Sequence, residues 1–455
     1  MFTDPVASYH QLQAEIRSLA NRNPFAAAIN LRLERIKALL DVLGHPERGY
    51  PIVHVGGTSG KGSTATFTAS LLRAHGKKVG LHLSPHLQVV NERHQIDLRP
   101  APTSSLVRLW PTLAAAIPVA AARTPFGAAS YFEVQLALSL LLFADEGVDV
   151  AVVEVGVGGT RDATNVLDTR VAILTNVGLD HTDILGDTVE LIAADKIGIV
   201  KPNQDVFSAV TQDAVRQMLR DRCRQQGARL TLIEDDAPID RYPDGTFAVT
   251  LPRRQLDGLR LDGQRLDGLR TAMPGRFQPT NAALALSAAA VLLGALDAAM
   301  VREALLVQLP GRIEQVQHQP TVILDGAHNP DKVAGTVDAL RDRGLDGRRI
   351  TVVAIKAGKD AETILTAIDE MSDAVILTRF DDKGPWKATP PSVLQAILPH
   401  GEIIDDPLEA TRTALARASA ADMVWVTGSL YLVGDVRALW HPLPALLRSL
   451  EPDGR

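Results

Sequence analysis

The sequence has little of several features that mark particular classes of protein. Its 455 residues include one cysteine, Cys223, which excludes an intrachain disulfide and a cysteine-rich zinc cage. A reducing compartment, the cytoplasm, is therefore expected. Lysine and arginine form no concentrated basic run, and the net charge of -6 argues against nucleic acid as a partner.

Long hydrophobic runs are also missing. The most apolar run, residues 136–144, is too short to cross a bilayer of about 30 Å as a helix. Asp4 and Pro5 stand where a signal peptide would need a basic and then an apolar stretch. The sequence thus predicts a soluble protein without a membrane partner. Its composition, 46% hydrophobic and 22% charged, is that of a globular chain with two large domains or about three smaller ones.

The spacing of apolar residues predicts an α/β fold. Between about residues 10 and 45, "LRLERIKALLDVLG" has helical spacing and Gly44 would end this lead-in helix. Short apolar runs bounded by glycine then alternate with helical patterns, and we interpret these runs as strands: "PIVHVGG", "VDVAVVEVGVGG", "RVAILTNVG" and "DVFSAV". This alternation favours a mostly parallel sheet with helices on both faces.

The middle of the chain has a different texture. Polar and apolar residues alternate over residues 230–272, and "LDGLRLDGQRLDGLR" repeats an Asp-Gly element. These residues are either hairpins added to the sheet or a surface excursion without chemical importance. "NAALALSAAAVLLGAL" then predicts a buried helix that begins near Asn281. The sequence assigns no role to residues 101–128, rich in alanine and proline, or to residues 255–270.

A second α/β domain is predicted after the Pro310-Gly311 pair. "TVILDG", "ITVVAI", "DAVILT" and "DMVWVTG" are each followed by a helical pattern. The expected division is residues 1–308 and residues 309–455. Two such sheets joined by a short hinge indicate an active site in the cleft between them.

A phosphate site is predicted at "VHVGGTSGKGSTATFTASLLRAHG". It departs from the strict phosphate-loop pattern, because Gly62 stands between Lys61 and Ser63 and Val55 replaces the first glycine. The order of strand, glycine loop and helix still directs backbone N–H groups toward one anion, and Lys61 would add positive charge. Ser63 and Thr64 offer hydroxyls to a metal ion, although Ser63 could simply cap the helix.

Acidic and histidine residues follow two neighbouring strands. Glu154 ends an apolar strand, where an unpaired charge is costly, and magnesium would be a suitable partner. Asp180 and His181 follow another strand and should reach the same carboxyl edge of the sheet. Each of them alone could be structural. Lys196 lies among apolar residues of "TVELIAADKIGIVKP", where a solvated surface lysine is the default interpretation.

The order of these motifs resembles that of the folylpolyglutamate synthases and dihydrofolate synthases of the Mur ligase superfamily. The resemblance covers nearly the whole chain. Its motifs are "GGTSGKGS", "SPHLQVVNER", "YFE", "EVGVGGTRDATN", "LDHTD", "ADKIGI", "MPGRFQPTNAALA", "LPGRIE", "DGAHNP", "GKD" and "TGSLYLVG". It implies a two-domain Mur-ligase-like fold, with a phosphate-loop N-terminal ATPase domain and a smaller Rossmann-like C-terminal glutamate ligase domain.

The resemblance also implies an ADP-forming ligase. ATP would phosphorylate the carboxylate of dihydropteroate or of a reduced folate that already carries glutamate, and the amine of L-glutamate would attack the acyl phosphate. A carboxylate is a poor electrophile, and phosphate provides it with a leaving group. The implied cofactors are ATP and two magnesium ions. A monomer is expected, because the cleft needs one chain.

Site residues carry over from the family motifs one position at a time. ATP would contact Thr58, Gly60, Lys61, Gly62, Ser63, Thr64, Asn281 at the adenine, Arg312 and Asp325. Magnesium would bind Ser63, Glu154 and His181, and the catalytic group would be Lys61, Lys196, Arg312 and His328. The substrate residues would be Ser84, Pro85, Phe132 and Asp162 in the pteroate pocket and Ser429 near glutamate. Phe132 and Asp162 suit a flat ring rich in hydrogen-bond donors.

Lys196 matches a lysine that is carbamylated in this superfamily. Carbamylation requires a neutral amine, whereas a free lysine has a pKa of about 10.4, so burial must first favour the uncharged form. Two positions depart from the family pattern. Ser59 stands where asparagine is usual, and Thr160 separates Arg161 from the preceding glycines, which affects the expected detail of pterin or glutamate recognition.

Other functions remain as alternatives. A Mur-type ligase could act on a non-folate acceptor, which "SPHL" and "YFE" disfavour, and a nucleotide-binding module could lack ligase activity. Simple ATP binding would not need His181, Lys196, Asp325 and His328 together. A dehydrogenase is disfavoured because no G-x-G-x-x-G follows a strand in the required place.

Overall fold

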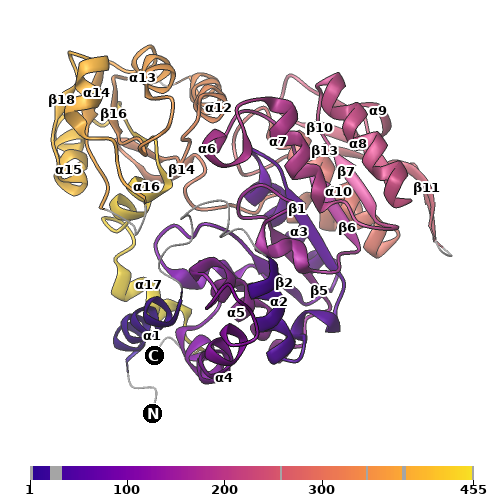
Figure 1. The fold of residues 1–455 in the computed structure, drawn as a ribbon. Helices are drawn as coiled ribbons and strands as arrows, with labels where there is room; N and C mark the ends of the chain where they lie inside the picture. The colour runs from indigo at the N-terminus through magenta and orange to yellow at the C-terminus, as the bar shows by residue number, and fades with distance from the viewer. Residues whose placement is uncertain (1–3, 21–32, 257–258, 345–346, 382–385, 453–455) are drawn as a thin grey trace.

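The computed structural model describes residues 4–20, 33–256, 259–344, 347–381 and 386–452. Figure 1 shows a larger body, coloured indigo through magenta to rose, and a smaller orange and yellow body. The last helix of the chain leaves the smaller body and lies beside the first helix. The described chain therefore has the predicted two-part α/β architecture.

The main sheet of the N-terminal part contains eight of the described strands, in the order β4-β3-β2-β5-β1-β6-β7-β8. Their bounds are β1 (Ile52–Gly56), β2 (Val79–His82), β3 (His94–Ile96), β4 (Arg99–Pro100), β5 (Val150–Glu154), β6 (Val171–Leu174), β7 (Asp205–Ser208) and β8 (Arg229–Leu232). The pairs β2–β3 and β3–β4 at one edge are antiparallel, and the other pairs are parallel. β1 lies between β5 and β6, so the loops after these three strands meet.

Helices cover both faces of this sheet. They are α1 (Pro5–Leu19), α2 (Leu33–Val42), α3 (Lys61–Ala74), α4 (Thr103–Ala121), α5 (Tyr131–Glu146), α6 (Thr182–Leu185), α7 (Val189–Lys196), α8 (Asp213–Gln226), α9 (Ile233–Asp236), α10 (Gln278–Leu293) and α11 (Ala298–Ala304). Among the described residues, 3-10 turns lie in the connections of this part: η2 (Pro46–Gly49), η3 (Val90–Arg93), η4 (Ala163–Val166) and η5 (Ile197–Ile199). Val53 packs in one core with α3 and α10, whereas Ile52 packs in another core with α5, because successive strand side chains point to opposite faces.

The N-terminal region contains two helices, α1 and α2, where a single lead-in helix was predicted. Asp4 caps α1 and Pro5 occupies its first turn, which is a favourable start for a helix. The residues between the two helices, 21–32, lie outside the described residues. α4 occupies part of residues 101–128. It is long and apolar enough to span a membrane, but core helices of soluble proteins often have the same length and composition. Its apolar residues pack in one core with α1, α2 and α5.

Residues 239–269 form small sheets of their own. β9 (Ile239–Arg241), β10 (Phe247–Thr250) and β13 (Arg265–Leu269) make one, and β11 (Arg253–Leu256) and β12 (Leu259–Asp262) make another. The prediction that these hairpins extend the main sheet is wrong. Phe247, Leu266 and Leu269 pack in the core that contains α10, so the three-stranded sheet covers a helix. Asp257 and Gly258 of the Asp-Gly repeat lie outside the described residues.

The C-terminal part has a six-stranded sheet among the described residues, in the order β14-β15-β19-β16-β17-β18. Its strands are β14 (Glu314–His318), β15 (Thr321–Leu324), β16 (Arg349–Val353), β17 (Ala374–Leu377), β18 (Glu402–Ile403) and β19 (Met423–Thr427). All pairs except β14 with β15 are parallel. The helices are α12 (Pro330–Arg341), α13 (Ala361–Asp369), α14 (Pro391–Ile397), α15 (Pro407–Arg417), α16 (Leu430–Arg437) and α17 (Leu443–Leu450).

The final helix, α17, connects the two parts a second time. Leu447 is fully buried in a cluster with Tyr9, Val89 and Val90 of the N-terminal part. The Oγ of Ser104 donates a hydrogen bond of 2.5 Å to Glu451 just after α17. The smaller body is thus joined to the larger one both at the segment before β14 and through α17.

Candidate active site

The loop between β1 and α3 requires glycine at two positions. Gly57 has φ +138° and Gly60 has φ +81°, both in the region that side chains rarely adopt. A Cβ atom at Gly57 would lie 1.9 Å from Thr175 Oγ1, and one at Gly60 would lie 2.6 Å from Asn281 Oδ1. The loop can therefore pass close to both neighbours only as glycine. α3 begins at Lys61 with Gly60 as its N-cap, so the alternative in which Ser63 only caps the helix is wrong.

Neutral polar groups after β6 hold this loop. Ser59 N–H donates to Asn176 Oδ1 at 2.8 Å, and the hydroxyl of Thr175 donates to the Ser59 carbonyl at 2.6 Å. The hydroxyl of Thr58 donates a hydrogen bond to the carbonyl of Gly178 and accepts one from the Gly178 N–H. Within the described residues, the hydroxyls of Ser59 and Thr64 are buried without a hydrogen-bond partner. Such orphaned groups in a glycine loop at a helix N-terminus fit a phosphate group with its metal ion.

Asn281 lies directly against this loop. The backbone of α10 begins at Gln278, and the Nδ2 of Asn281 donates to Gln278 Oε1 at 2.9 Å. This places the residue predicted for adenine beside the residue predicted for phosphate, although 221 positions separate Gly60 from Asn281 in the chain. The packing of α10 on α3 brings them together.

Glu154 ends β5 and faces the same loop. Its carboxylate oxygens lie 3.7 and 3.8 Å from the Cβ position of Gly62, and one of them accepts a hydrogen bond of 2.9 Å from Ser84 N–H. Burial raises the pKa of Glu154, while Lys61 and Arg312 lower it in part. A buried carboxylate with cations around it suits a hard divalent metal. Ser84, which precedes Pro85, is thereby connected to the predicted metal ligand.

His181 follows β6 as predicted and has φ 52°. Burial lowers its pKa to about 3, which keeps the imidazole neutral and able to bind a metal. The described residues contain no cluster of three histidine, cysteine, aspartate or glutamate side chains with metal-ligand spacing. The predicted ligands include only two residues of these types, Glu154 and His181, because the third ligand is a serine. The set of Ser63, Glu154 and His181 therefore stays a prediction.

Lys196, the last residue of α7, is buried beside the loop. Its Nζ donates to the carbonyl of Gly57 at 3.2 Å, and the Nζ of Lys61 donates to the same carbonyl at 3.1 Å. Burial, followed by the charge of Lys61, lowers the pKa of Lys196 to about 7. The default interpretation as a solvated surface lysine is therefore wrong, and burial favours the neutral amine as expected.

In the C-terminal part, Asp325 follows β15 and is fully enclosed by donors. It accepts hydrogen bonds from Ile313 N–H at 2.9 Å, Ala327 N–H at 3.0 Å and Thr336 Oγ1 at 2.8 Å. Burial raises its pKa. These bonds attach the segment before β14 to the end of β15. Arg312 in that segment places Nη1 3.0 Å from the Cβ position of Gly326.

Asp180 connects the two parts across the interface. It accepts a hydrogen bond of 3.1 Å from Asn329, forms an ion pair of 3.5 Å with Lys332 and also pairs with Lys359. Burial opposes ionisation, but the nearby cations, Lys332 first, lower the pKa of Asp180 well below its usual range. Asn329 and Lys359 lie in the "DGAHNP" and "GKD" motifs, and Lys332 follows the former. The charge and hydrogen-bonding capacity of these three residues were the signal by which the sequence analysis could have assigned them to the site.

Phe132 and Asp162, predicted for the pteroate pocket, converge on Gly156. A Cβ atom there would lie 2.8 Å from Phe132 Cζ and 2.9 Å from Asp162 Oδ2. Asp162 accepts hydrogen bonds from Val157 N–H at 2.9 Å and from Thr164 N–H at 3.0 Å. It therefore orders its own loop as well as lining this region.

Ser429, predicted near glutamate, is the N-cap of α16 and accepts a hydrogen bond of 3.1 Å from Tyr431 N–H. The next residue, Leu430, would lie 3.5 Å from a Cβ atom at Gly311 and only 2.2 Å from one at Gly326, so it packs directly on Gly326. Ser429 is thus one residue from the group around Arg312. No contact between Ser429 and another predicted site residue is seen in the described part of the chain.

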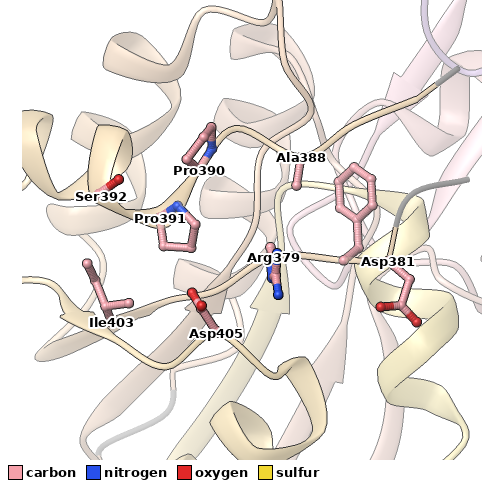
Figure 2. A pocket seen from close by; sticks show the side chains of 9 residues that line it. Arg379, Asp381, Ala388, Pro390, Pro391, Ser392, Ile403 and Asp405 are labelled. Atoms are coloured by element: carbon pink, nitrogen blue, oxygen red, sulfur yellow. The ribbon is translucent and has the colours of Figure 1, made fainter.

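A separate pocket of about 570 Å³ lies at the ends of β17 and β18. Figure 2 shows its lining side chains, which are Arg379, Phe380, Asp381, Ala388, Pro390, Pro391, Ser392, Ile403 and Asp405. None of the predicted site residues is among them. The lining combines one arginine with two aspartates on an exposed face. None of the predicted binding or catalytic roles corresponds to this set of residues.

Two family models match the chain. The Mur ligase middle domain matches residues 103–289, and the Mur ligase glutamate ligase domain matches residues 311–430. The dihydrofolate synthase/folylpolyglutamate synthase of Bacillus subtilis is 31% identical over 412 residues, 89% of this chain and 94% of the relative. A probable bifunctional folylpolyglutamate synthase/dihydropteroate synthase of Haloferax volcanii is 34% identical over 90% of this chain. The chain spans about half of that longer relative, 48%.

Solved structures are also similar over nearly the whole chain. Mycobacterium tuberculosis folylpolyglutamate synthase complexed with ADP and AMPPCP has a TM-score of 0.83 and 28% identity, over 96% of this chain and 99% of that one. The bifunctional folylpolyglutamate synthase/dihydrofolate synthase of Yersinia pestis, complexed with AMPPNP and Mn ion, has a TM-score of 0.80 and 28% identity. That similarity covers 96% of this chain and 98% of the Yersinia pestis chain.

Proposed function

The chain belongs to the folylpolyglutamate synthase/dihydrofolate synthase family of Mur ligases, and we propose that it joins L-glutamate to a pteroate or folate carboxylate at the expense of ATP. ADP and phosphate are the other products. ATP and a divalent metal ion take part. One observation carries the proposal: Asp180 of the phosphate-loop part is held by Asn329, Lys332 and Lys359 of the other part. This contact supports a phosphate site that faces the second-domain residues assigned to the ligation.

The phosphate loop would bind the nucleotide. The N–H groups of the loop and Lys61 hold the phosphates, together with Thr58, Gly60, Gly62, Ser63 and Thr64. Asn281 contacts the adenine, and Ser63, Glu154 and His181 hold the metal ion, which neutralises phosphate charge when bound. The orphaned hydroxyls of Ser59 and Thr64 support this assignment. Positioning and charge neutralisation are the main requirements of phosphoryl transfer.

The second part would act on the transferred phosphoryl group and on glutamate. Arg312 neutralises charge on the phosphoryl group, and Asp325 fixes the segment that carries Arg312. His328 is oriented toward the same region, and Ser429 lies near glutamate. On the other side of the cleft, Phe132 stacks on the pterin, and Ser84, Pro85 and Asp162 line its pocket. The contact of Ser84 with Glu154 supports a substrate loop next to the metal site.

Lys196 would be carbamylated and would support a second magnesium ion. Its burial and its pKa of about 7 favour the neutral amine that reacts with carbon dioxide. Intact-protein mass of the Lys196→Ala variant and of the unchanged protein, both prepared in bicarbonate, tests this. A carbamyl mass present only with Lys196 is expected. Full activity of Lys196→Ala would contradict the role.

We further propose a cytoplasmic monomer with domains at residues 1–308 and 309–455, acting on dihydropteroate as well as on reduced folates. The reacting carboxylate and amine are the same in both cases, so one site can serve both. The assay is ADP release with Mg-ATP and L-glutamate, comparing 7,8-dihydropteroate with tetrahydrofolate, with products identified by mass. Release with one acceptor alone names the single activity. Release with neither overturns the folate assignment and favours a Mur-type ligase with another acceptor.

A further inference from the structure

His328 lies just before α12 and Lys332 lies in the first turn of that helix, and the tautomer of His328 can be deduced. His328 Nδ1 lies 2.8 Å from the carbonyl oxygen of Gly326. A carbonyl oxygen only accepts, so Nδ1 carries the proton. Burial lowers the pKa of His328 well below its usual value, which keeps the ring neutral. Nε2 therefore presents a lone pair, and it faces Lys332 Nζ at 3.1 Å.

The surroundings of Lys332 come from both parts of the protein. Asp180 reaches it from the loop after β6 at 3.5 Å, and His328 reaches it from its own segment. Lys61, Arg312 and Lys359 are the neighbouring cations. Burial lowers the pKa of Lys332 to about 7, Asp180 opposes this shift, and the three cations reinforce it. At neutral pH a large fraction of Lys332 is therefore the free amine.

Ligation requires a base, and His328 is a weak one because burial lowers its pKa well below the usual value. The α-ammonium group of an amino acid has no lone pair and cannot attack an acyl phosphate until it loses a proton. Lys61 and Arg312 are cations placed for phosphate, and Asp325 already accepts three hydrogen bonds. Lys332 contacts His328 and Asp180 and interacts electrostatically with Lys61 and Arg312, the residues assigned to phosphate.

We propose that Lys332 is the general base that takes a proton from the ammonium group of the incoming glutamate. This inference rests on the proposed function. The Lys332 amine accepts one proton and becomes an ammonium group, which donates to His328 Nε2 and pairs with Asp180. The glutamate amine then attacks the acyl carbon, a C–N bond forms and the C–O bond to phosphate breaks. The second amine proton leaves with the phosphate as hydrogen phosphate, and Lys332 returns its proton to water after product release.

The test compares two nucleophiles in the full-length enzyme with Mg-ATP and the pteroate acceptor. L-Glutamate needs the base, whereas hydroxylamine is largely unprotonated at neutral pH and traps the acyl phosphate as a hydroxamate. Lys332→Met should lower glutamate-dependent turnover about 100-fold and leave hydroxamate formation within about twofold of the unchanged enzyme. Equal loss with both nucleophiles would overturn the proposal, because Lys332 would then act in phosphoryl transfer.

Lys332→Arg separates a base from a structural cation. Arginine keeps the positive charge and the donors to His328 and Asp180, but it cannot lose a proton at neutral pH. It should be as defective with glutamate as Lys332→Met, and recovery of turnover with arginine would overturn the proposal. Arg341→Met removes an exposed cation from the other end of α12 and serves as the matched control. It should keep full glutamate-dependent turnover.

A pH profile gives a second readout. Glutamate-dependent turnover of the unchanged enzyme should fall as the pH decreases through about 7, because Lys332 becomes protonated. The Lys332→Arg variant should lack this inflection. An identical inflection in the variant would assign the titration to another group. If the unchanged enzyme forms no hydroxamate with any pterin acceptor, the proposed function fails, which is a result distinct from failure of the Lys332 inference.

Discussion

The phosphate loop and the opposing cation cluster, defined as Arg312, Lys332 and Lys359, are held by different kinds of interaction. Short hydrogen bonds within one domain hold the loop: Thr175 donates one to Ser59, and Asn176 accepts one from Ser59. Two of the three cations, Lys332 and Lys359, pair with Asp180 of the other domain. The comparison indicates that the loop is preformed within one domain, whereas the cation cluster depends on how the two domains meet.

The largest expected effect is on the preformed side. Glu154→Ala and Lys61→Ala should each reduce ADP formation at least about 100-fold, because preorganised charges at the phosphate are lost. Thermal unfolding should show that the fold survives, and steady-state ADP release measures the effect. A variant that is folded and turns over normally would contradict the assignment of the loop and of Glu154.

The sequence predicted this side better than the other for a physical reason. Gly57, Gly60 and Lys61 are close in the chain, so their geometry follows from local strand, turn and helix signals. The parallel strands and the second sheet were predicted from alternating apolar patterns. The contacts of Asp180 with Asn329 and Lys359 depend on domain packing over more than 140 positions, which no local pattern encodes.

Other differences between expectation and structure arose from tertiary packing. Lysine is usually a surface residue, but α7 places Lys196 behind the phosphate loop. There the amines of Lys196 and Lys61 both donate hydrogen bonds to the carbonyl of Gly57. The hairpins of residues 239–269 cover α10 instead of extending the sheet. In both cases burial against an element distant in sequence decided the outcome.

The second-largest effect concerns the connection through α17. Leu447→Ala removes a fully buried side chain from the cluster with Tyr9, Val89 and Val90, and should cost about 2–5 kcal/mol in the free energy of unfolding. The effect on glutamate ligation should exceed the effect on nucleotide binding, because ligation would use more residues of the C-terminal part than nucleotide binding does. Denaturant unfolding and fluorescent-nucleotide titration measure the two. Equal losses of glutamate ligation and of nucleotide binding would contradict the contrast between the phosphate loop and the cation cluster.

Acid should weaken the N-terminal core through its buried histidines. Burial lowers the pKa of His54 and of His94 to about 3, so between that value and about 6.5 the unfolded chain binds more protons than the folded one. The free energy of unfolding should therefore fall by about 1.4 kcal/mol per pH unit for each histidine as the pH decreases below about 6.5. Denaturant titrations of His54→Gln at pH 7 and pH 5.5 should show a smaller decrease. If the free energy of unfolding of His54→Gln decreased with pH as steeply as that of the unchanged protein, this would contradict the argument that burial lowers the pKa of His54.

The smallest effect should come from an exposed ion pair between the domains. Arg276 forms two hydrogen bonds of 2.8 and 2.9 Å with Asp342, yet its side chain is 74% exposed. Arg276→Ala should change Tm by no more than about 2 °C and leave turnover nearly unchanged, because solvent screens such pairs. Calorimetry checks this, and a large loss of turnover would show that domain placement depends on surface charge as well as on Asp180.

The measurement that tests the central claim most directly follows an oxygen atom. The acceptor is prepared with ¹⁸O in the reacting carboxylate and ligated to L-glutamate with Mg-ATP, and the released phosphate is analysed by mass spectrometry. Transfer of the γ-phosphoryl group to the carboxylate predicts one ¹⁸O atom in each phosphate that accompanies an amide product. Phosphate without the label, formed together with amide, would contradict activation of the acceptor as an acyl phosphate in this cleft.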